Sequence, residues 1–312
     1  MVIYLKKLFM FLLCLILGLF IYTYKNNITE YILLNYVYKN DFNYDSSNEY
    51  KITNEFSYFK LTDNYKPENK KDIFNIIYNA INNGYESFNF YCQNSYETCL
   101  DDVKDLTSDY ELLSVINNFV HPYNSYNKLN VTINSLGKIN IKVQKLYNES
   151  TINILNKKID TVYNELITDN MTDYDKIKII HDYIIDNSVY DEQRANNLYN
   201  DYQGEFSSNI ATGPLLQGHG ICSGYTDAMK LFLDKMNIPN YKISSENHIW
   251  NLVYINNKWL HLDLTWDDPV INNGEISTID HTYFLIDTNK LLNIEKTEHN
   301  FDENIFIEAK KA

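Results

Sequence analysis

Apolar and polar residues alternate along the C-terminal half of this chain with the period of two that is typical of strands. Residues 248–255 and 258–265 both follow this pattern. Asn256 and Asn257 lie between them, and asparagines tolerate the positive φ values that a two-residue hairpin turn requires. The pattern therefore predicts an antiparallel hairpin.

The two faces of this hairpin differ. In the predicted register the numbers of facing residues sum to 513, so that His248 faces Thr265 and Trp250 faces Asp263. His248 and Asp263 are then diagonal neighbours, with Cβ atoms roughly 7 Å apart. Because side chains alternate between faces, we expect a His-Asp face and an almost wholly apolar core face. The core face carries Ile249, Val253, Ile255, Leu260, Leu262 and Leu264, and the other face also carries Leu252 and His261.

A helical period begins after the glycines that surround Cys222. Its apolar stripe is formed by Tyr225, Met229, Phe232, Leu233 and Met236, and Pro239 follows its end. Cys222 is thus predicted on the first turn of a largely buried helix, where unpaired N–H groups and the helix dipole favour a thiolate. A lone cysteine in such a helix usually serves packing. The added His-Asp face favours thiol-based acyl transfer instead.

Three motifs resemble those of a known family. They are residues 220–225 (Gly-Ile-Cys-Ser-Gly-Tyr), 248–251 (His-Ile-Trp-Asn) and 262–269 (Leu-Asp-Leu-Thr-Trp-Asp-Asp-Pro). As a set they resemble the transglutaminase-like superfamily, in particular its bacterial members with a secreted or membrane-anchored catalytic core. The stretch 179–191 resembles the helix before that core, so the resemblance covers residues 170–290.

The resemblance implies a papain-like α+β fold, with a nucleophile helix packed on an antiparallel sheet. It also implies that Cys222 is the nucleophile, His248 the general base and acid, and Asp263 the residue that orients the imidazole. Ile249 departs from the family pattern, in which many relatives have alanine after the histidine. Since Ile249 lies on the predicted core face, we expect no chemical consequence.

Other residues near the motifs receive weaker assignments. His261 shares the site face and competes with His248 as partner of Asp263, although its side chain points parallel to that of Asp263 on the same strand. Gln217 precedes Cys222 by five residues and could supply an oxyanion-hole side chain. No direct role is expected for His219, which lies in a Gly-flanked loop, and His181 is expected to pack or hydrogen-bond within its own helix.

No metal or cofactor is predicted. Residues 266–269 (Trp-Asp-Asp-Pro) are expected to form a turn in which the aspartates bind local backbone. The chain has one histidine cluster and no Cys-x-x-Cys pair, which argues against zinc. The acidic residues do not form the alternating oxygen-ligand loop of a calcium site.

The N-terminus predicts a membrane location. Residues 8–24 are uncharged and mostly apolar, and Lys6 and Lys7 precede them. Because no small-x-small cleavage site follows, we expect an uncleaved, single-pass signal anchor, with a cleaved signal and a secreted protein as the alternative. Positive charge before the span places the N-terminus in the cytoplasm and the catalytic domain outside the cell. Cys92 and Cys99 could form a disulfide in that oxidising exterior.

Four regions are expected along the chain. They are an anchor at 1–25, a stalk at 26–67, a small α+β domain at 68–168 and a transglutaminase-like catalytic core at 169–312. The predicted elements before the core are helices at 28–38, 68–83, 99–118 and 151–168, a strand at 88–92, and a hairpin of 128–134 with 138–147 around Ser135, Leu136 and Gly137.

The predicted function is thiol-dependent acyl transfer on protein or peptide amides through a thioester. Crosslinking, deamidation and amide hydrolysis all remain open, and cell-wall peptides are one substrate class that fits an outward-facing domain. The net charge of −14 argues against nucleic acid as a partner. The alternatives are a cell-surface cysteine protease and a catalytically idle binding module.

Overall fold

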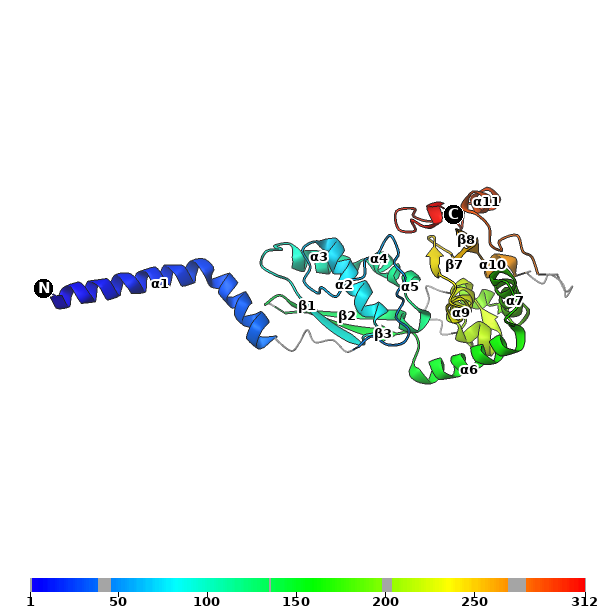
Figure 1. Ribbon diagram of the computed structural model, residues 1–312, viewed down its shortest axis with the longest axis horizontal. Helices are drawn as coiled ribbons and strands as arrows, with labels where there is room; N and C mark the ends of the chain where they lie inside the picture. Colours follow the sequence, from blue (N-terminus) through cyan, green and yellow to red (C-terminus); the bar gives the residue numbers. More distant parts are fainter. Residues whose placement is uncertain (1, 39–45, 135, 198–203, 269–278, 312) are drawn as a thin grey trace.

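The chain begins with a long helix and continues into a folded body that contains two three-stranded antiparallel sheets (Figure 1). The computed structural model describes residues 2–38, 46–134, 136–197, 204–268 and 279–311. The mixture of helices and antiparallel sheets confirms the predicted α+β class. Ser135 and Pro269, which belong to two of the predicted turns, lie outside the described residues.

The N-terminal helix is longer than the predicted anchor. Helix α1 (Val2–Ile32) continues directly into the π-helix η1 (Leu33–Val37), past the expected boundary at residue 25. The stretch Tyr4–Val37 is long and apolar enough to cross a membrane or to act as a signal sequence. Figure 1 shows α1 projecting away from the folded body.

The first sheet has the strand order β1-β3-β2. Its strands are β1 (Ser87–Tyr91), β2 (Tyr126–Ile133) and β3 (Lys138–Lys145), which confirms the predicted strand and hairpin. The predicted helix at 68–83 is α2 (Lys70–Asn82), and the one at 151–168 is α6 (Glu149–Leu166).

The single helix predicted for 99–118 is wrong. The segment forms α3 (Cys99–Ser108), α4 (Tyr110–Ser114) and α5 (Ile116–Phe119), followed by the 3₁₀ turn η2 (Pro122–Asn124). Asp109 breaks the helix because its side chain accepts a hydrogen bond from the Leu112 backbone N–H and thereby caps a new helix.

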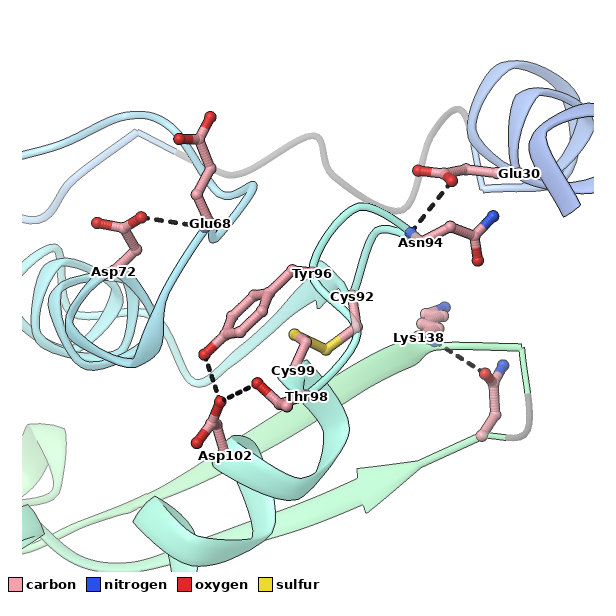
Figure 2. Close-up of a disulfide and its surroundings, with 11 residues drawn as sticks. Glu30, Glu68, Asp72, Cys92, Asn94, Tyr96, Thr98, Cys99, Asp102 and Lys138 are labelled. Atoms are coloured by element: carbon pink, nitrogen blue, oxygen red, sulfur yellow. Dashed lines mark hydrogen bonds between the residues drawn. A yellow bond between two sulfur atoms is a disulfide. The ribbon is translucent and has the colours of Figure 1, made fainter.

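Cys92 and Cys99 form a disulfide that links the end of β1 to the start of α3 (Figure 2). The loop between them lies beside the end of α1, and the Asn94 backbone N–H donates to the Glu30 carboxylate. On the other side of the disulfide, the Tyr96 and Thr98 hydroxyls both donate to Asp102. This bridge agrees with an oxidising location for the folded body.

Replacing Cys92 and Cys99 together by alanine is expected to lower the free energy of unfolding by about 2–3 kcal/mol, because the unfolded chain gains the entropy of an open loop. Chemical denaturation of the full chain in detergent measures this loss. A reductant should cause a similar loss in the wild type and none in the double variant. A wild-type protein that keeps its full stability under reducing conditions would contradict the prediction.

The second sheet is built on the predicted hairpin. Its strands are β6 (Asn240–Ser244), β7 (Ile249–Ile255) and β8 (Lys258–Leu262), in that order. Leu252 pairs with His261, which confirms the predicted register. Asn256 and Asn257 adopt φ values of 52° and 61°, as the turn requires.

The second hairpin strand ends three residues earlier than predicted. The Asp263 side chain accepts the Thr265 and Trp266 backbone N–H groups and so caps a short helix, α10 (Leu264–Asp267). The predicted pairs of His248 with Thr265 and of Trp250 with Asp263 therefore do not form as strand pairs.

The remaining elements surround the second sheet. Helix α9 (Cys222–Lys235) contacts β6, β7 and helix α7 (Asp173–Asp186). A short parallel pair, β4 (Val189–Tyr190) with β5 (His219–Gly220), leads into α9. The other elements are α8 (Glu192–Ala195), the π-helix η3 (Gly213–Gln217), α11 (Thr288–Ile294) and η4 (Ala309–Lys311).

Both faces of the second sheet are buried. On one face, Val253, Ile255 and Leu262 join a cluster with α6, α7 and α9, as predicted for the core face. The other face packs against α2, α5 and the first sheet, and we call this shared core the joint apolar cluster. The residues that the second sheet contributes to it are Tyr241, Ile243, Trp250 and Leu252. The face predicted to carry the site is thus covered over most of its length, because Trp250 and Leu252 are apolar and need a partner.

The segment before α2 also packs into the joint apolar cluster. Phe56, Phe59 and Tyr65 are buried there, although the sequence pattern predicts a stalk over 26–67. Phe59 stacks on Tyr78 of α2, with ring centroids 4.1 Å apart. The spacing of these aromatic residues follows neither the helical nor the strand period. They are buried only because they pack against a surface that is distant in the sequence.

Candidate active site

Cys222 is the first residue of α9 and its side chain is a partly exposed free thiol. The helix starts at this position because two backbone segments meet closely. The Ile221 N–H donates to the Ser208 carbonyl at 2.9 Å, and a Cβ on Gly224 would lie 2.2 Å from the same oxygen. The glycine therefore permits this close approach. No side chain caps the start of α9 by a hydrogen bond within the described residues, and the first-turn N–H groups favour negative charge there.

His248 and Asp263 meet beside this helix start. His248 directly precedes β7, and a turn holds it through the bond from the Ser245 N–H to the His248 carbonyl. Its Nε2 lies 2.5 Å from Asp263 Oδ2, and both side chains are buried. The Cys222 side chain lies close enough to His248 to influence its pKa. Since Nε2 faces the carboxylate, Nδ1 is the ring nitrogen that remains for the thiol.

Electrostatics favour a charged imidazole in this chain of contacts. Burial lowers the pKa of His248, but the charge and hydrogen bond of Asp263, together with the nearby Cys222, outweigh burial and raise the pKa to about 10. Burial also acts to raise the pKa of Asp263. The charge and hydrogen bond of His248, and a further bond from His299, hold that pKa well below its usual range. Asp263 is therefore an ionised carboxylate at neutral pH.

The region that holds these three side chains matches a known family. Residues 160–264 match the sequence model of the Transglutaminase-like superfamily. This part of the chain is a transglutaminase-like domain. It contains Cys222, His248 and Asp263, and it begins within α6, before the predicted core boundary at residue 169.

Two solved structures are similar in part to this chain. One is a crystal structure of a TGase, with 13% sequence identity, a TM-score of 0.34, and coverage of 50% of this chain and 48% of the TGase. The other is a proposed cysteine protease from Cytophaga hutchinsonii, with 13% identity, a TM-score of 0.27, and coverage of 44% of this chain and 61% of the protease. The chain thus spans about half of the TGase. No curated protein matches the chain in sequence.

A second histidine, from outside the transglutaminase-like domain, contacts Asp263, and the sequence analysis missed it. His299 Nε2 lies 2.9 Å from Asp263 Oδ2, and its Nδ1 lies 3.0 Å from Glu295 Oε2. His299 is fully buried. It follows α11 in a segment with neither a periodic pattern nor a motif, and it lies outside the matched residues 160–264. No local signal points to it.

His261 does not compete with His248 for the role of base. Trp250 Nε1–H donates to His261 Nδ1 at 2.9 Å, which fixes the tautomer, and His261 Nε2–H then faces Thr288 Oγ1 at 2.8 Å. Burial, followed by the nearby His299, lowers the pKa of His261 to about 3. His261 is a neutral structural residue that links the sheet to α11.

Two further candidates lie just before the nucleophile helix. The His219 ring stacks on Phe206, with ring centroids 3.8 Å apart. Gln217 Oε1 accepts the Ser207 N–H at 2.7 Å, so this side chain is tied to the loop before η3. Its amide nitrogen is a possible donor to an oxyanion, and this role stays a prediction.

The expectation for the Asp-Asp turn is corrected. The expectation for His181 is confirmed in part, because His181 is buried and its Nδ1 lies 2.9 Å from Asp182 Oδ1 on the same helix. Asp267 Oδ1 accepts the distant Tyr283 N–H, and Asp267 Oδ2 lies 3.2 Å from His181 Nε2. Asp268 accepts the Tyr225 hydroxyl at 2.6 Å. These aspartates thus connect α10 to α7, to α9 and to the turn at Tyr283, because burial leaves each carboxylate in need of donors.

Within the part of the chain that the structure describes, two groups of side chains are close enough to hold a metal ion. They are His181, Asp182 and His281, and His248, Asp263 and His299, with ligand atoms within 4.8 Å of one another in each group. A metal needs the lone pair of an imidazole nitrogen. In both groups the ring nitrogens that approach the shared carboxylate are placed to donate protons to it. We assign neither group as a metal site, and the absence of a metal stays a prediction.

Proposed function

We propose that the transglutaminase-like domain catalyses acyl transfer on protein or peptide amides, with Cys222 as nucleophile, His248 as acid and base, and Asp263 as the orienting carboxylate. The observation that carries the proposal is the arrangement of three side chains. The His248 ring is hydrogen-bonded to the buried Asp263, and the partly exposed Cys222 thiol lies near enough to His248 to raise its pKa. Nucleophile, base and orienting group within hydrogen-bond reach are the geometric requirement for this chemistry.

In the first step, the Cys222 thiolate, paired with the protonated His248, attacks the carbonyl carbon of a substrate amide. The developing oxyanion needs hydrogen-bond donors. Backbone N–H groups at the start of α9, where the N-cap side chain makes no hydrogen bond, are one candidate, and the Gln217 amide is a second. The C–N bond then breaks, and His248 gives its proton to the departing amine or ammonia. A thioester on Cys222 remains.

In the second step, His248 takes a proton from the incoming nucleophile as the nucleophile attacks the thioester, and the C–S bond breaks. The thiolate leaves on Cys222 and the imidazolium is restored. An amine gives a new amide and a crosslink, whereas water gives a carboxylate. Water attack corresponds to deamidation when a glutamine side chain was the donor, and to proteolysis when a main-chain amide was.

The location of this activity follows from the N-terminal helix. We propose that α1 and η1 anchor the chain in a membrane, with the N-terminus in the cytoplasm and the folded body outside. The Cys92–Cys99 disulfide and the two lysines before the apolar run support this orientation. Substrates are then surface proteins or peptides, with cell-wall peptides as one class. Residues 68–168 are proposed as a supporting domain, since they share the joint apolar cluster with the second sheet.

The test of the triad is the rate at which iodoacetamide alkylates Cys222 in the full chain in detergent, followed by mass spectrometry of the Cys222 peptide. In the proposed triad, a neighbouring imidazolium stabilises the thiolate that reacts with iodoacetamide. We therefore expect the rate at pH 6 to fall at least about tenfold in His248→Ala.

His281→Ala removes a histidine outside the triad and should leave the rate unchanged. Equal rates in the wild type and in His248→Ala would overturn the catalytic assignment and favour a binding module.

A further inference from the structure

The Thr226 hydroxyl lies between the two segments that carry Cys222 and His248. Thr226 opens the second turn of α9 and is buried. Its Oγ1 lies 2.7 Å from the Cys222 carbonyl oxygen and 3.0 Å from the Ile249 carbonyl oxygen, and it shares its one proton between these two acceptors. Because Ile249 directly follows His248, one hydroxyl connects the backbone of the proposed nucleophile to that of the proposed base.

Half of this arrangement is common in helices. A threonine hydroxyl often donates to the carbonyl four residues earlier, and such a bond by itself indicates no function. Thr107 of α3 makes this kind of bond, with the Val103 carbonyl at 2.7 Å. The bond from Thr226 to Ile249 differs because it leaves the helix and reaches a strand residue that lies 23 positions further along the chain.

The Ile249 carbonyl points away from β6. In an antiparallel sheet, successive residues of a strand direct their backbone groups to opposite sides. The Tyr254 N–H donates to the carbonyl of Pro239, just before β6, so the even-numbered residues of β7 face β6. Ile249 and the other odd-numbered residues of β7 therefore face β8.

Strand β8 ends before it reaches Ile249. The last pair of this ladder is Asn251 with Leu262, and the same register would place Leu264 beside Ile249. Leu264 is instead the first residue of α10. The Ile249 carbonyl is thus left without a strand partner, and since Ile249 is only partly exposed, this carbonyl needs another donor. The Thr226 hydroxyl supplies it.

A second side chain ties the same part of α9 to β7. Asn251 is buried, and its Nδ2 donates to the Thr226 carbonyl at 3.1 Å. One bond thus runs from the helix to the strand, and the other runs from the strand to the helix. Together they fix how the start of α9 lies against the start of β7.

We propose that Thr226 is a positioning residue that sets the spacing between the Cys222 thiol and the His248 ring. This inference rests on the proposed function. Proton transfer between a thiol and an imidazole requires that both are held within hydrogen-bond reach of each other. The Thr226 hydroxyl holds the backbone of both segments from one point. Because Thr226 is buried, it acts through these two residues and not by contact with substrate.

The experiment is a double-mutant cycle on the rate at which iodoacetamide alkylates Cys222 at pH 6 in the full chain in detergent. Thr226→Val replaces the hydroxyl by a methyl group, and a methyl carbon approaches a carbonyl oxygen only to about 3.3 Å. The two carbonyls must then retreat. Thr226→Ser keeps the hydroxyl, and Thr107→Val is the matched control. Each variant is made with and without His248→Ala.

In Thr226→Val we expect the rate to fall by about three- to tenfold, because a misplacement of about 1 Å at a reactive site costs on the order of 100-fold. Thr226→Ser and Thr107→Val should keep the wild-type rate. In the His248→Ala background, Thr226→Val should have no further effect, because the partner whose distance it changes is gone. General loosening of the fold would act in both backgrounds.

Two results would overturn the inference, and they differ in what they leave standing. If His248→Ala lowers the rate while Thr226→Val leaves it unchanged, or lowers it equally in both backgrounds, the role of Thr226 is rejected and the triad stands. If His248→Ala has no effect, the Cys222–His248 pair is rejected, and with it both proposals. Far-UV circular dichroism checks that each variant is folded. Thr226→Ala, which also lacks the hydroxyl but adds no clash, replaces Thr226→Val if the latter unfolds.

Discussion

Replacing Cys222 by alanine is expected to lower acyl transfer by at least about 1,000-fold, because no other group at this helix start can form the thioester. The substitution removes only the sulfur atom from a partly exposed side chain, so the fold should persist. Incorporation of a fluorescent primary amine into casein by the full chain in detergent measures the rate. Cys14→Ala removes the other free thiol, which lies exposed on α1, and serves as the matched control.

The products of the same assay separate the reaction types. Amine incorporation marks crosslinking, a mass increase of about 1 Da on glutamine marks deamidation, and new chain termini mark proteolysis. Activity that survives in Cys222→Ala would show that another residue forms the covalent bond. The proposed nucleophile would then be wrong, whichever product is found.

The substitution Asp263→Asn is expected to affect both activity and stability. Asparagine keeps the shape of the side chain but places an amide or a neutral oxygen where two imidazole N–H groups now bond to a carboxylate. The rate should fall by about 10,000-fold, because His248 loses its orientation and its stabilising charge. The free energy of unfolding should fall by about 3–5 kcal/mol, since the buried imidazoles are left without their anionic partner.

The loss of stability in Asp263→Asn is expected to depend on pH. The pKa of Asp263 is lowered on folding, so its contribution to stability is complete above its unfolded value of about 4 and is lost as the pH falls through its folded pKa. The stability difference between the wild type and Asp263→Asn should therefore be full at pH 7 and shrink below about pH 4. Chemical denaturation at several pH values measures it.

Asp287→Asn is the matched control. Asp287 also caps a helix, α11, through the Lys290 N–H, but it is exposed. Asparagine caps a helix about as well as aspartate, so a change of less than about 0.5 kcal/mol is expected. If Asp263→Asn cost as little as Asp287→Asn, Asp263 would be a helix cap and not the anionic partner of the imidazoles.

The helix that begins at Cys222 and the hairpin with its Asn256-Asn257 turn could be predicted from the sequence. Both predictions rest on local patterns. The helix follows from the helical spacing of apolar residues that begins after the glycines, and the register of the hairpin follows from its alternating apolar and polar residues. The three residues Cys222, His248 and Asp263 also came from local motifs, and the structure brings them together.

The route by which Asp263 reaches His248 was predicted incorrectly. Periodicity extended β8 to residue 265, whereas Asp263 leaves the strand and caps α10. The alternating pattern of apolar and polar residues does not reveal that a polar side chain can accept hydrogen bonds from nearby backbone N–H groups. Such capping competes directly with strand pairing. The carboxylate therefore belongs at once to a helix start and to the site.

The sequence by itself determined the candidate site residues and the N-terminal helix of this protein: a thiol at a helix start, an imidazole before a strand, a carboxylate after the next strand, and an apolar N-terminal segment. Only the tertiary structure decided what surrounds that chemistry. It placed Phe56 and Phe59 in the joint apolar cluster, buried Trp250, and brought His299 to Asp263 across 36 residues. Contacts between segments far apart in the chain leave no periodic trace in either segment, because each is satisfied only by the other.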